Sequence, residues 1–317
     1  MSHLLVRQGR LLPVWRVILY LIAFQIAGLL VQIPLVAALA LYSVVSGVPD
    51  HFLAGAAGLP TAILLASSVA TLASALVVTW FFRTRVDGES LSSLGLTREE
   101  RSVRQLTAGV AAGVLAMAGI FAVSWGAGWI GSVQPAWTAG PADALLWDLL
   151  LFTIAFVSVS LTEEIAFRGY VLQNLREQAG WPVAILGSSL LFAGFHGLNP
   201  GFGAGALAGI AAAGLFLALG YRISGALWFP IGLHFAWNTA EGPIFGFPVS
   251  GLVTPSLLIL EPGVGDPLVT GGAFGPEAGL LGIGAALLGG LALWIWHLRG
   301  RRAENRAQAT GGGLDNA

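Results

Sequence analysis

The chain consists largely of long apolar runs separated by short segments rich in Gly, Pro and charged residues. A run of about 20 apolar residues, at about 1.5 Å per residue, is long enough to cross the roughly 30 Å hydrocarbon core of a bilayer. The runs predicted to span a membrane are 14–45, 59–82, 106–130, 145–170, 181–198, 203–221, 224–245 and 278–298. The pattern therefore predicts an all-α fold, a polytopic membrane helical bundle of about eight transmembrane helices.

The first run is longer than one crossing requires, so we expect a tilt or a kink at Pro34. A cleaved signal peptide is the alternative, since Ala38-Leu39-Ala40 resembles a cleavage site, but the run is longer than a typical signal sequence. We find no soluble domain and no internal repeat. Residues 1–317 are predicted to form a single integral membrane domain with a disordered tail at 303–317.

Composition supports the membrane assignment, because 56% of the residues are hydrophobic and only 10% are charged. A soluble domain carries about 25% charged residues. Cysteine is absent, which excludes disulfides, thiolate nucleophiles and cysteine metal sites. No basic domain suggests a nucleic-acid partner; the expected partners are the lipid bilayer and a peptide or protein at the membrane, and the oligomeric state is not predicted.

The distribution of basic residues predicts the orientation. All 15 basic residues are arginines, and with eight spans every one falls on one side of the membrane or near that side's end of a span. The segments on the opposite side, which contain no arginine, are 46–58, 131–144, 199–202 and 246–277. Positive charge accumulates on cytoplasmic loops, so both termini are predicted to be cytoplasmic. Arginine without lysine, with many Gly, Ala and Leu, is typical of a GC-rich prokaryotic genome and suggests a prokaryotic cell membrane.

Two connecting segments are long. Segment 83–105 carries charges of both signs and is predicted to be a solvated connector with a short helix around Thr97-Arg98-Glu99-Glu100. Segment 246–277 is rich in Pro and Gly and remains apolar at 257–260. It is either a cover over an opening in the bundle or an irregular loop, and we favour the loop.

Three ionisable residues at the end of an apolar run are the most informative feature of the chain. Glu163, Glu164 and Arg168 follow the apolar residues 149–161. A charge at the bilayer centre costs about 2.5–3.5 kcal/mol on insertion scales, so such residues are usually functional. Glu164 and Arg168 are four apart and can pair on one helix face, whereas Glu163 lies about 100° around the helix and is free for another role.

Two further polar pairs lie in later apolar runs: Phe192 with His196, and His234 with Asn238. Each pair has a spacing of four, so its members share a helix face, and the Phe192 ring can wall off one side of the imidazole. A carboxylate in a poorly solvated pocket can accept a proton from water, and a His can share that task or hold a metal that activates the water. A second His with an Asn supplies donors to a developing oxyanion. Together these groups suit hydrolysis of a peptide bond without a covalent intermediate.

These residues resemble the motifs of a known family. The segments are Glu163-Glu164-Ile165-Ala166-Phe167-Arg168, Phe192-Ala193-Gly194-Phe195-His196 and His234-Phe235-Ala236-Trp237-Asn238. They are similar to the EExxxR, FxxxH and HxxxN motifs of the CPBP family, the CAAX proteases and bacteriocin-processing enzymes. All three occur in the family's order, and the resemblance covers about 145–245, the predicted catalytic motif core.

The resemblance implies an all-helical intramembrane endopeptidase, similar to the CAAX prenyl endopeptidases that trim lipidated C-termini. By analogy, Glu163 and His196 activate water, His234 and Asn238 bind the oxyanion, and Glu164 and Arg168 orient the site.

Relatives in this family are often called metalloproteases. Glu163, His196 and His234 are therefore candidate ligands for Zn²⁺ or another divalent metal. They lack the HExxH spacing that makes a zinc prediction strong, and the motifs leave metal use open.

A straight-helix count raises one difficulty, because it puts Glu163 and His196 toward opposite ends of successive spans. They can meet if the fourth span continues to about Leu175, or if the fifth span starts as an interfacial helix after Trp181-Pro182. Both explanations remain open from the sequence.

Other interpretations are weaker. Gly263-Val264-Gly265-Asp266 matches the GxGD of aspartyl intramembrane proteases, but a turn explains it better. Gly187-Ser188-Ser189-Leu190 has the GxSx form of rhomboid proteases, but small residues that pack a membrane helix explain it as well. Two non-enzymatic functions remain open. The family resemblance also allows a membrane scaffold or bacteriocin self-immunity protein, and the Glu/His cluster also suits a channel or proton-coupled carrier.

Overall fold

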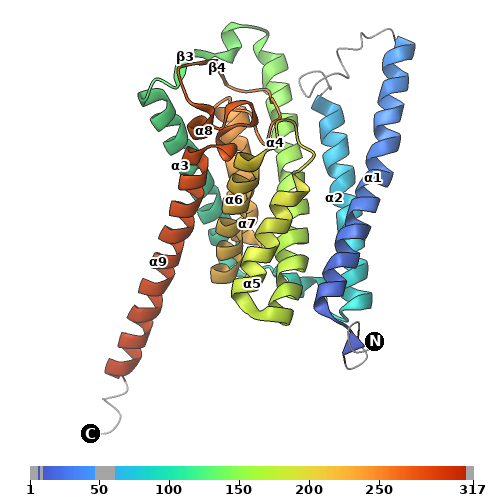
Figure 1. The fold of residues 1–317 in the computed structure, drawn as a ribbon, viewed down its shortest axis with the longest axis vertical. Helices are drawn as coiled ribbons and strands as arrows, with labels where there is room; N and C mark the ends of the chain where they lie inside the picture. Colours follow the sequence, from blue (N-terminus) through green and yellow to red (C-terminus); the bar gives the residue numbers. More distant parts are fainter. Residues whose placement is uncertain (1–5, 8–9, 47–60, 312–317) are drawn as a thin grey trace.

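The computed structural model describes residues 6–7, 10–46 and 61–311, which form a bundle of helices (Figure 1). The α-helices are α1 (Pro13–Ser46), α2 (Thr61–Phe81), α3 (Glu100–Gly126), α4 (Ala142–Glu164), α5 (Leu172–Phe195), α6 (Ala204–Ser224), α7 (Trp228–Thr239), α8 (Pro267–Thr270) and α9 (Leu280–Gly311). The π-helices are η3 (Phe82–Val86), η6 (Ile165–Val171) and η7 (Ala240–Ile244), and the 3₁₀ turns are η4 (Leu91–Leu94), η5 (Ala136–Thr138), η8 (Gly272–Phe274) and η9 (Pro276–Ala278). The predicted polytopic helical bundle is confirmed.

Two short antiparallel pairs of strands interrupt the all-α pattern. β1 (Val6–Arg7) pairs with β2 (Arg10–Leu11), and β3 (Ile130–Pro135) pairs with β4 (Leu258–Pro262). The second pair lies at the end of the bundle opposite the two chain termini (Figure 1). Segment 246–277 is therefore more ordered than the predicted irregular loop, because β4, α8, η8 and η9 all form within it or at its end.

Six helical segments of the described residues are long and apolar enough to cross a membrane. They are Pro13–Leu35, Leu64–Val86, Glu100–Gly126, Ala142–Phe195, Ala204–Ser224 and Leu280–Arg302. Large apolar side chains such as Leu30, Val77 and Trp296 point outward from these helices and are well exposed, which fits contact with lipid. Two predicted spans differ from this set: 181–198 is part of the fourth segment, and 224–245 contains only the short α7 and η7.

The fourth segment turns back on itself at Gly180. Gly180 has φ 77° and ψ 179°, a backbone conformation that residues with a side chain rarely adopt. This conformation breaks α5 into two halves. The Phe167 ring lies 5.3 Å from that of Phe192 and 5.2 Å from that of Phe195, so the returning half runs beside η6 (Figure 1). The fourth span thus continues past Leu175, as in the first of the two explanations given above. Glu163 therefore lies near the middle of the continuous helical segment formed by α4, η6 and the first half of α5.

Close packing of α3 against α7 positions the helix that carries His234 and Asn238. A Cβ atom on Gly109 or Gly113 of α3, or on Gly232 of α7, would clash with backbone atoms of the opposite helix. Small residues let membrane helices approach closely, where dispersion contacts and not the hydrophobic effect hold them together. Gly232 therefore holds α7 against α3 two residues before His234.

Other details differ from the predictions. The short helix expected near Thr97 is instead the start of α3, where the Glu99 and Ser102 side chains cap each other's backbone, and the connector has its helical turn at η4.

α1 is helical through Pro34 and packs against α2 and α5, so it is part of the fold. Part of the predicted disordered tail, 303–311, continues α9, because Ala, Glu, Gln and Arg favour helix; 312–317 lie outside the described residues.

Candidate active site

The two adjacent glutamates lie in the last turn of α4, where the chain changes to the π-helix η6. π-Helical turns are rare and often occur at functional sites. Glu164 and Arg168 nevertheless keep the predicted pairing, with Arg168 Nη1 2.8 Å from Glu164 Oε1. Both side chains are fully buried, whereas Glu163 reaches a cavity and is partly exposed.

The Glu164–Arg168 pair is part of a buried network that holds His234. The Nδ1 atom of His234 lies 2.9 Å from Glu164 Oε1, and Arg168 Nη2 donates to the carbonyl of Gly214 at 3.3 Å. The Arg168 guanidinium also stacks 4.3 Å from the centre of the Phe192 ring. A carboxylate accepts hydrogen bonds, so His234 Nδ1 carries a proton and Nε2 faces the cavity.

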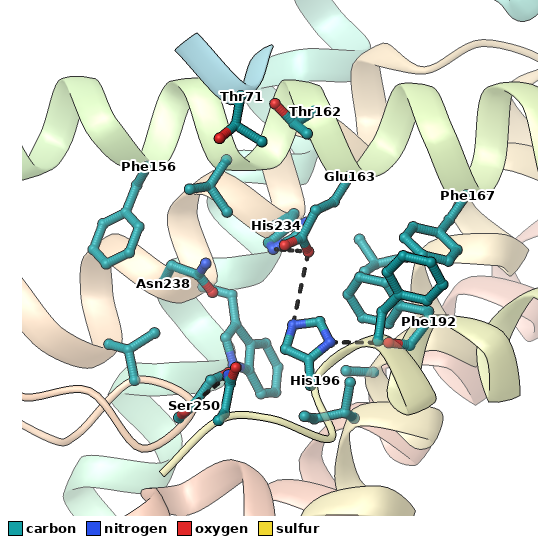
Figure 2. A pocket seen from close by; sticks show the side chains of 18 of the residues that line it. Thr71, Phe156, Thr162, Glu163, Phe167, Phe192, His196, His234, Asn238 and Ser250 are labelled. Carbon is teal, nitrogen blue, oxygen red and sulfur yellow. Dashed lines mark hydrogen bonds and ion pairs between the residues drawn. The ribbon is translucent and has the colours of Figure 1, made fainter. Parts of the chain in front are cut away.

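Glu163 brings the motifs together. Its Oε2 atom lies 3.8 Å from His196 Nε2 and 3.7 Å from His234 Nε2, and it has no hydrogen-bond partner among the described residues. These distances are too long for direct hydrogen bonds but suit a bridging water. Figure 2 shows the carboxylate pointing into the space between the two imidazoles.

His196 is the C-cap of α5 and is oriented by the backbone of the preceding turn. Its Nδ1 atom lies 2.9 Å from the carbonyl of Phe192 (Figure 2). A carbonyl only accepts, so Nδ1 donates and the Nε2 of the neutral ring presents its lone pair toward Glu163. The Phe192 ring lies 4.8 Å from the His196 ring, as the spacing of four predicts.

Four of the six candidate residues, all except Glu164 and Arg168, line one cavity of about 350 Å³. Asn238 points its amide into the same space as Glu163 and His196 (Figure 2), and its side chain makes no hydrogen bond with the described residues. Gln25, Gln32 and Thr71 of α1 and α2 also line the cavity, among mostly apolar side chains. Five of the six predicted site residues therefore lie at or beside one point, and Arg168 lies behind them.

The candidate metal ligands face one cavity, with the Glu163 Oε2 atom 3.7–3.8 Å from the two histidine Nε2 atoms. Glu163, His196 and His234 face one another, yet no three His, Asp or Glu side chains in the described part of the chain are grouped closely enough to hold a metal ion. Metal ligands lie about 2.0–2.2 Å from zinc. Metal use therefore stays a prediction, and no step below is derived through a metal.

Three polar residues of the same cavity region were not predicted. Ser250 and Glu277 line the cavity, and Glu241 is fully buried three residues after Asn238. Glu241 has a signal in the sequence, since it is an ionisable residue inside a predicted span. Ser250 and Glu277 have none, because they come from the segment next to the spans and reach the cavity only through the fold of the chain.

The competing protease motifs have structural roles. Asp266 caps α8, its Oδ1 atom accepting a hydrogen bond from the backbone N–H of Leu268 at 2.9 Å. Ser188 and Ser189 each donate to the carbonyl of Ile185 within α5. The interpretations as a turn and as helix packing therefore hold.

The fold and the site define a polytopic helical membrane protein with a buried Glu–His cluster. Residues 145–240 match the model of a family described as Rce1-like, type II CAAX prenyl endopeptidase Rce1-like. The match covers just under a third of the chain, includes all three motifs and confirms the resemblance over this segment. The family is one of endopeptidases, so the match indicates protease activity. No curated protein and no solved structure matches the chain.

Proposed function

We propose that this protein is an intramembrane endopeptidase that hydrolyses a peptide bond of a membrane-associated, lipidated peptide or protein with water activated by Glu163 and His196. The observation that carries the proposal is the placement of Glu163 Oε2 3.8 Å and 3.7 Å from the Nε2 atoms of two histidines in one cavity. A bridging water there can donate one proton to the carboxylate and one hydrogen bond to an imidazole.

In the first step, the water oxygen attacks the carbonyl carbon of the substrate while its proton passes to the Glu163 carboxylate. His196 holds the water, because its Nε2 lone pair accepts the second O–H. Its bond to the Phe192 carbonyl keeps the ring in that orientation. The product of this step is a tetrahedral intermediate with negative charge on the former carbonyl oxygen.

The charge on that oxygen is stabilised by the Asn238 amide and by His234. Because Nδ1 of His234 is engaged with Glu164, only its protonated form has a donor at Nε2. Glu164 and Arg168 hold the imidazole in place. Collapse of the intermediate breaks the C–N bond, and the proton on Glu163 passes to the leaving nitrogen, which restores the site.

The surroundings of the cavity support a substrate at the membrane. Its walls are mostly apolar and include residues of α1 and α2, such as Phe24, Leu29 and Thr71, so an extended apolar chain can lie against them. With the arginine-rich ends of the helices and both termini at the cytoplasmic face, as proposed from the charge distribution, cleavage takes place in the cytoplasmic membrane.

The deciding experiment compares peptide termini in membranes from cells that express the wild type or Glu163→Gln at equal levels. We expect new termini with the wild type alone, because the variant keeps the shape of the side chain and loses the base. Identical termini in two well-folded samples would favour a scaffold or self-immunity protein. Repeating the comparison with a chelator and with metal analysis of the purified protein tests the metal dependence separately.

A further inference from the structure

The cavity wall includes a carboxylate outside the catalytic motifs. Glu277, in η9, lines the cavity and is 7% exposed. Its Oε2 atom accepts hydrogen bonds from the Ser250 backbone N–H at 3.0 Å and from the Ser250 hydroxyl at 2.6 Å. Its Oε1 atom makes no hydrogen bond with the described residues. The side chain is thus held in place through one oxygen while the other is available.

The geometry around Ser250 is specific. It has φ 48°, a left-handed conformation that is rare for a residue other than glycine. Asn199 donates to its carbonyl at 3.1 Å, and the Asn199 backbone N–H donates to the carbonyl of His196 at 2.9 Å. A short chain of hydrogen bonds therefore fixes Glu277 relative to His196, and so relative to the reacting centre.

A second carboxylate lies behind the first. Glu241 is completely buried, and its carboxylate interacts electrostatically with Glu277. Two N–H groups face its carboxylate, the indole N–H of Trp237 and the backbone N–H of Glu277, but neither meets the distance and angle of a hydrogen bond with either oxygen. A buried carboxylate without partners is costly, and two together are stabilised either by a proton on one of them or by a nearby positive charge.

Among the described residues, no positively charged side chain is paired with either of these two carboxylates. None of the ion pairs within the described ranges includes Glu241 or Glu277. The segment 246–277 contains no arginine, and the chain has no lysine. A cation that enters the cavity would therefore meet Glu277, which lines it, with the buried Glu241 behind.

We propose that Glu277, backed by Glu241, is a specificity subsite that binds a cationic group of the peptide substrate, an ammonium or a guanidinium. The proposal rests on the proposed function and names a feature of its substrate. Because Glu277 is fixed relative to His196, the cationic group must lie at one set distance along the peptide from the cleaved bond. The source of the charge is either a Lys or Arg side chain or a free amino terminus.

The test uses the full-length protein in lipid nanodiscs and apolar peptides in which a single Lys is moved through successive positions. Each peptide is compared with one that has norleucine at the same position, and each pair is made with a free or an acetylated amino terminus. We expect the wild type to favour Lys by about tenfold in kcat/KM at one position only, the scale of a charge-assisted hydrogen bond. If the amino terminus is the cation, the Lys and norleucine peptides are cleaved equally, and acetylation lowers kcat/KM instead.

Glu277→Gln keeps an oxygen for Ser250 and loses the charge, so the Lys-to-norleucine ratio should fall to near one. The matched control is Glu261→Gln, which removes an exposed charge of β4 and should leave the ratio as in the wild type. The proposal would be overturned by a wild type that favours neither Lys nor a free amino terminus, or by a preference that is unchanged in Glu277→Gln.

Binding separates this proposal from the proposed function. The affinities of the same peptides are measured with Glu163→Gln, which should not cleave them. Tighter binding of the Lys peptides that is lost in Glu163→Gln/Glu277→Gln supports the subsite even if the wild type cleaves none of the peptides. Equal affinities for the Lys and norleucine peptides, and for the free and acetylated peptides, would contradict the subsite whether or not cleavage is observed.

Discussion

Two adjacent glutamates divide the centre of this protein into two regions with opposite properties. On the buried side of α4, Glu164 is ion-paired with Arg168 and hydrogen-bonded to His234, with both charged side chains fully buried. On the cavity side, the Glu163 Oε2 atom and the Asn238 amide make no hydrogen bonds with the described residues. The site thus separates support from reaction. The charges that orient His234 are paired with each other, although Glu164 Oε2 and Arg168 Nε have no hydrogen-bond partner among the described residues, and the groups that meet a substrate are left unpaired.

The largest effect should come from the open side. Replacing Glu163 with Gln removes the proposed base without changing shape, and general-base catalysis contributes about 10²–10⁴-fold, so kcat should fall by that factor. The thermal stability should stay close to that of the wild type, because this oxygen has no partner to lose. Cleavage of a peptide identified from the terminus comparison, followed by mass spectrometry, measures the rate. Retained cleavage would remove Glu163 from the mechanism.

The next largest effect should come from the buried side, and on stability. Arg168→Met leaves Glu164 as an unpaired buried charge, which typically costs about 3–5 kcal/mol. Denaturation in detergent micelles, followed by circular dichroism, measures the free energy of unfolding. Arg104→Met, at an exposed position of α3, is the control.

The double variant Glu164→Gln/Arg168→Met sharpens the same comparison. It removes both charges, so it should recover part of the lost stability while activity stays low, because His234 is no longer held. If Arg168→Met is as stable as the wild type, the Glu164–Arg168 pair does not stabilise the fold.

A somewhat smaller effect on activity is expected for the oxyanion donor. Asn238→Ala removes an amide that contacts the substrate oxygen only as charge develops, a loss of about 10²–10³ in kcat for comparable donors. KM should change little, because the contact is made in the transition state. Steady-state kinetics separate the two parameters. A rise in KM at constant kcat would instead assign Asn238 to substrate binding.

The smallest effect tests the rejected aspartyl-protease interpretation. Asp266→Ala removes the cap of α8, which should cost about 0.5–2 kcal/mol of local stability at most. Cleavage should continue at the wild-type rate, since Asp266 does not line the catalytic cavity. Kinetics of the variant beside Glu163→Gln make the contrast direct. Loss of turnover in a folded Asp266→Ala sample would reopen that interpretation.

Much of the site was predictable because its residues are costly where they occur. Ionisable and amide side chains are costly to place in membrane-spanning runs, so those that occur there are usually functional. A spacing of four puts each pair on one helix face. The Glu164–Arg168 pairing and the contact of Phe192 with His196 follow from that spacing alone. Ser250 and Glu277 were missed because polar residues beside a span carry no such cost.

The sequence by itself determined the helical membrane class, the positions of most helices and the identity of the central polar residues, because apolar length and local spacing are properties of contiguous chain. Only the tertiary structure decided how distant segments meet. The turn at Gly180 brings His196 back to Glu163, and the close approach at Gly232 holds the His234 helix in place. Such contacts depend on backbone geometry and packing between elements, which no local pattern of residues specifies.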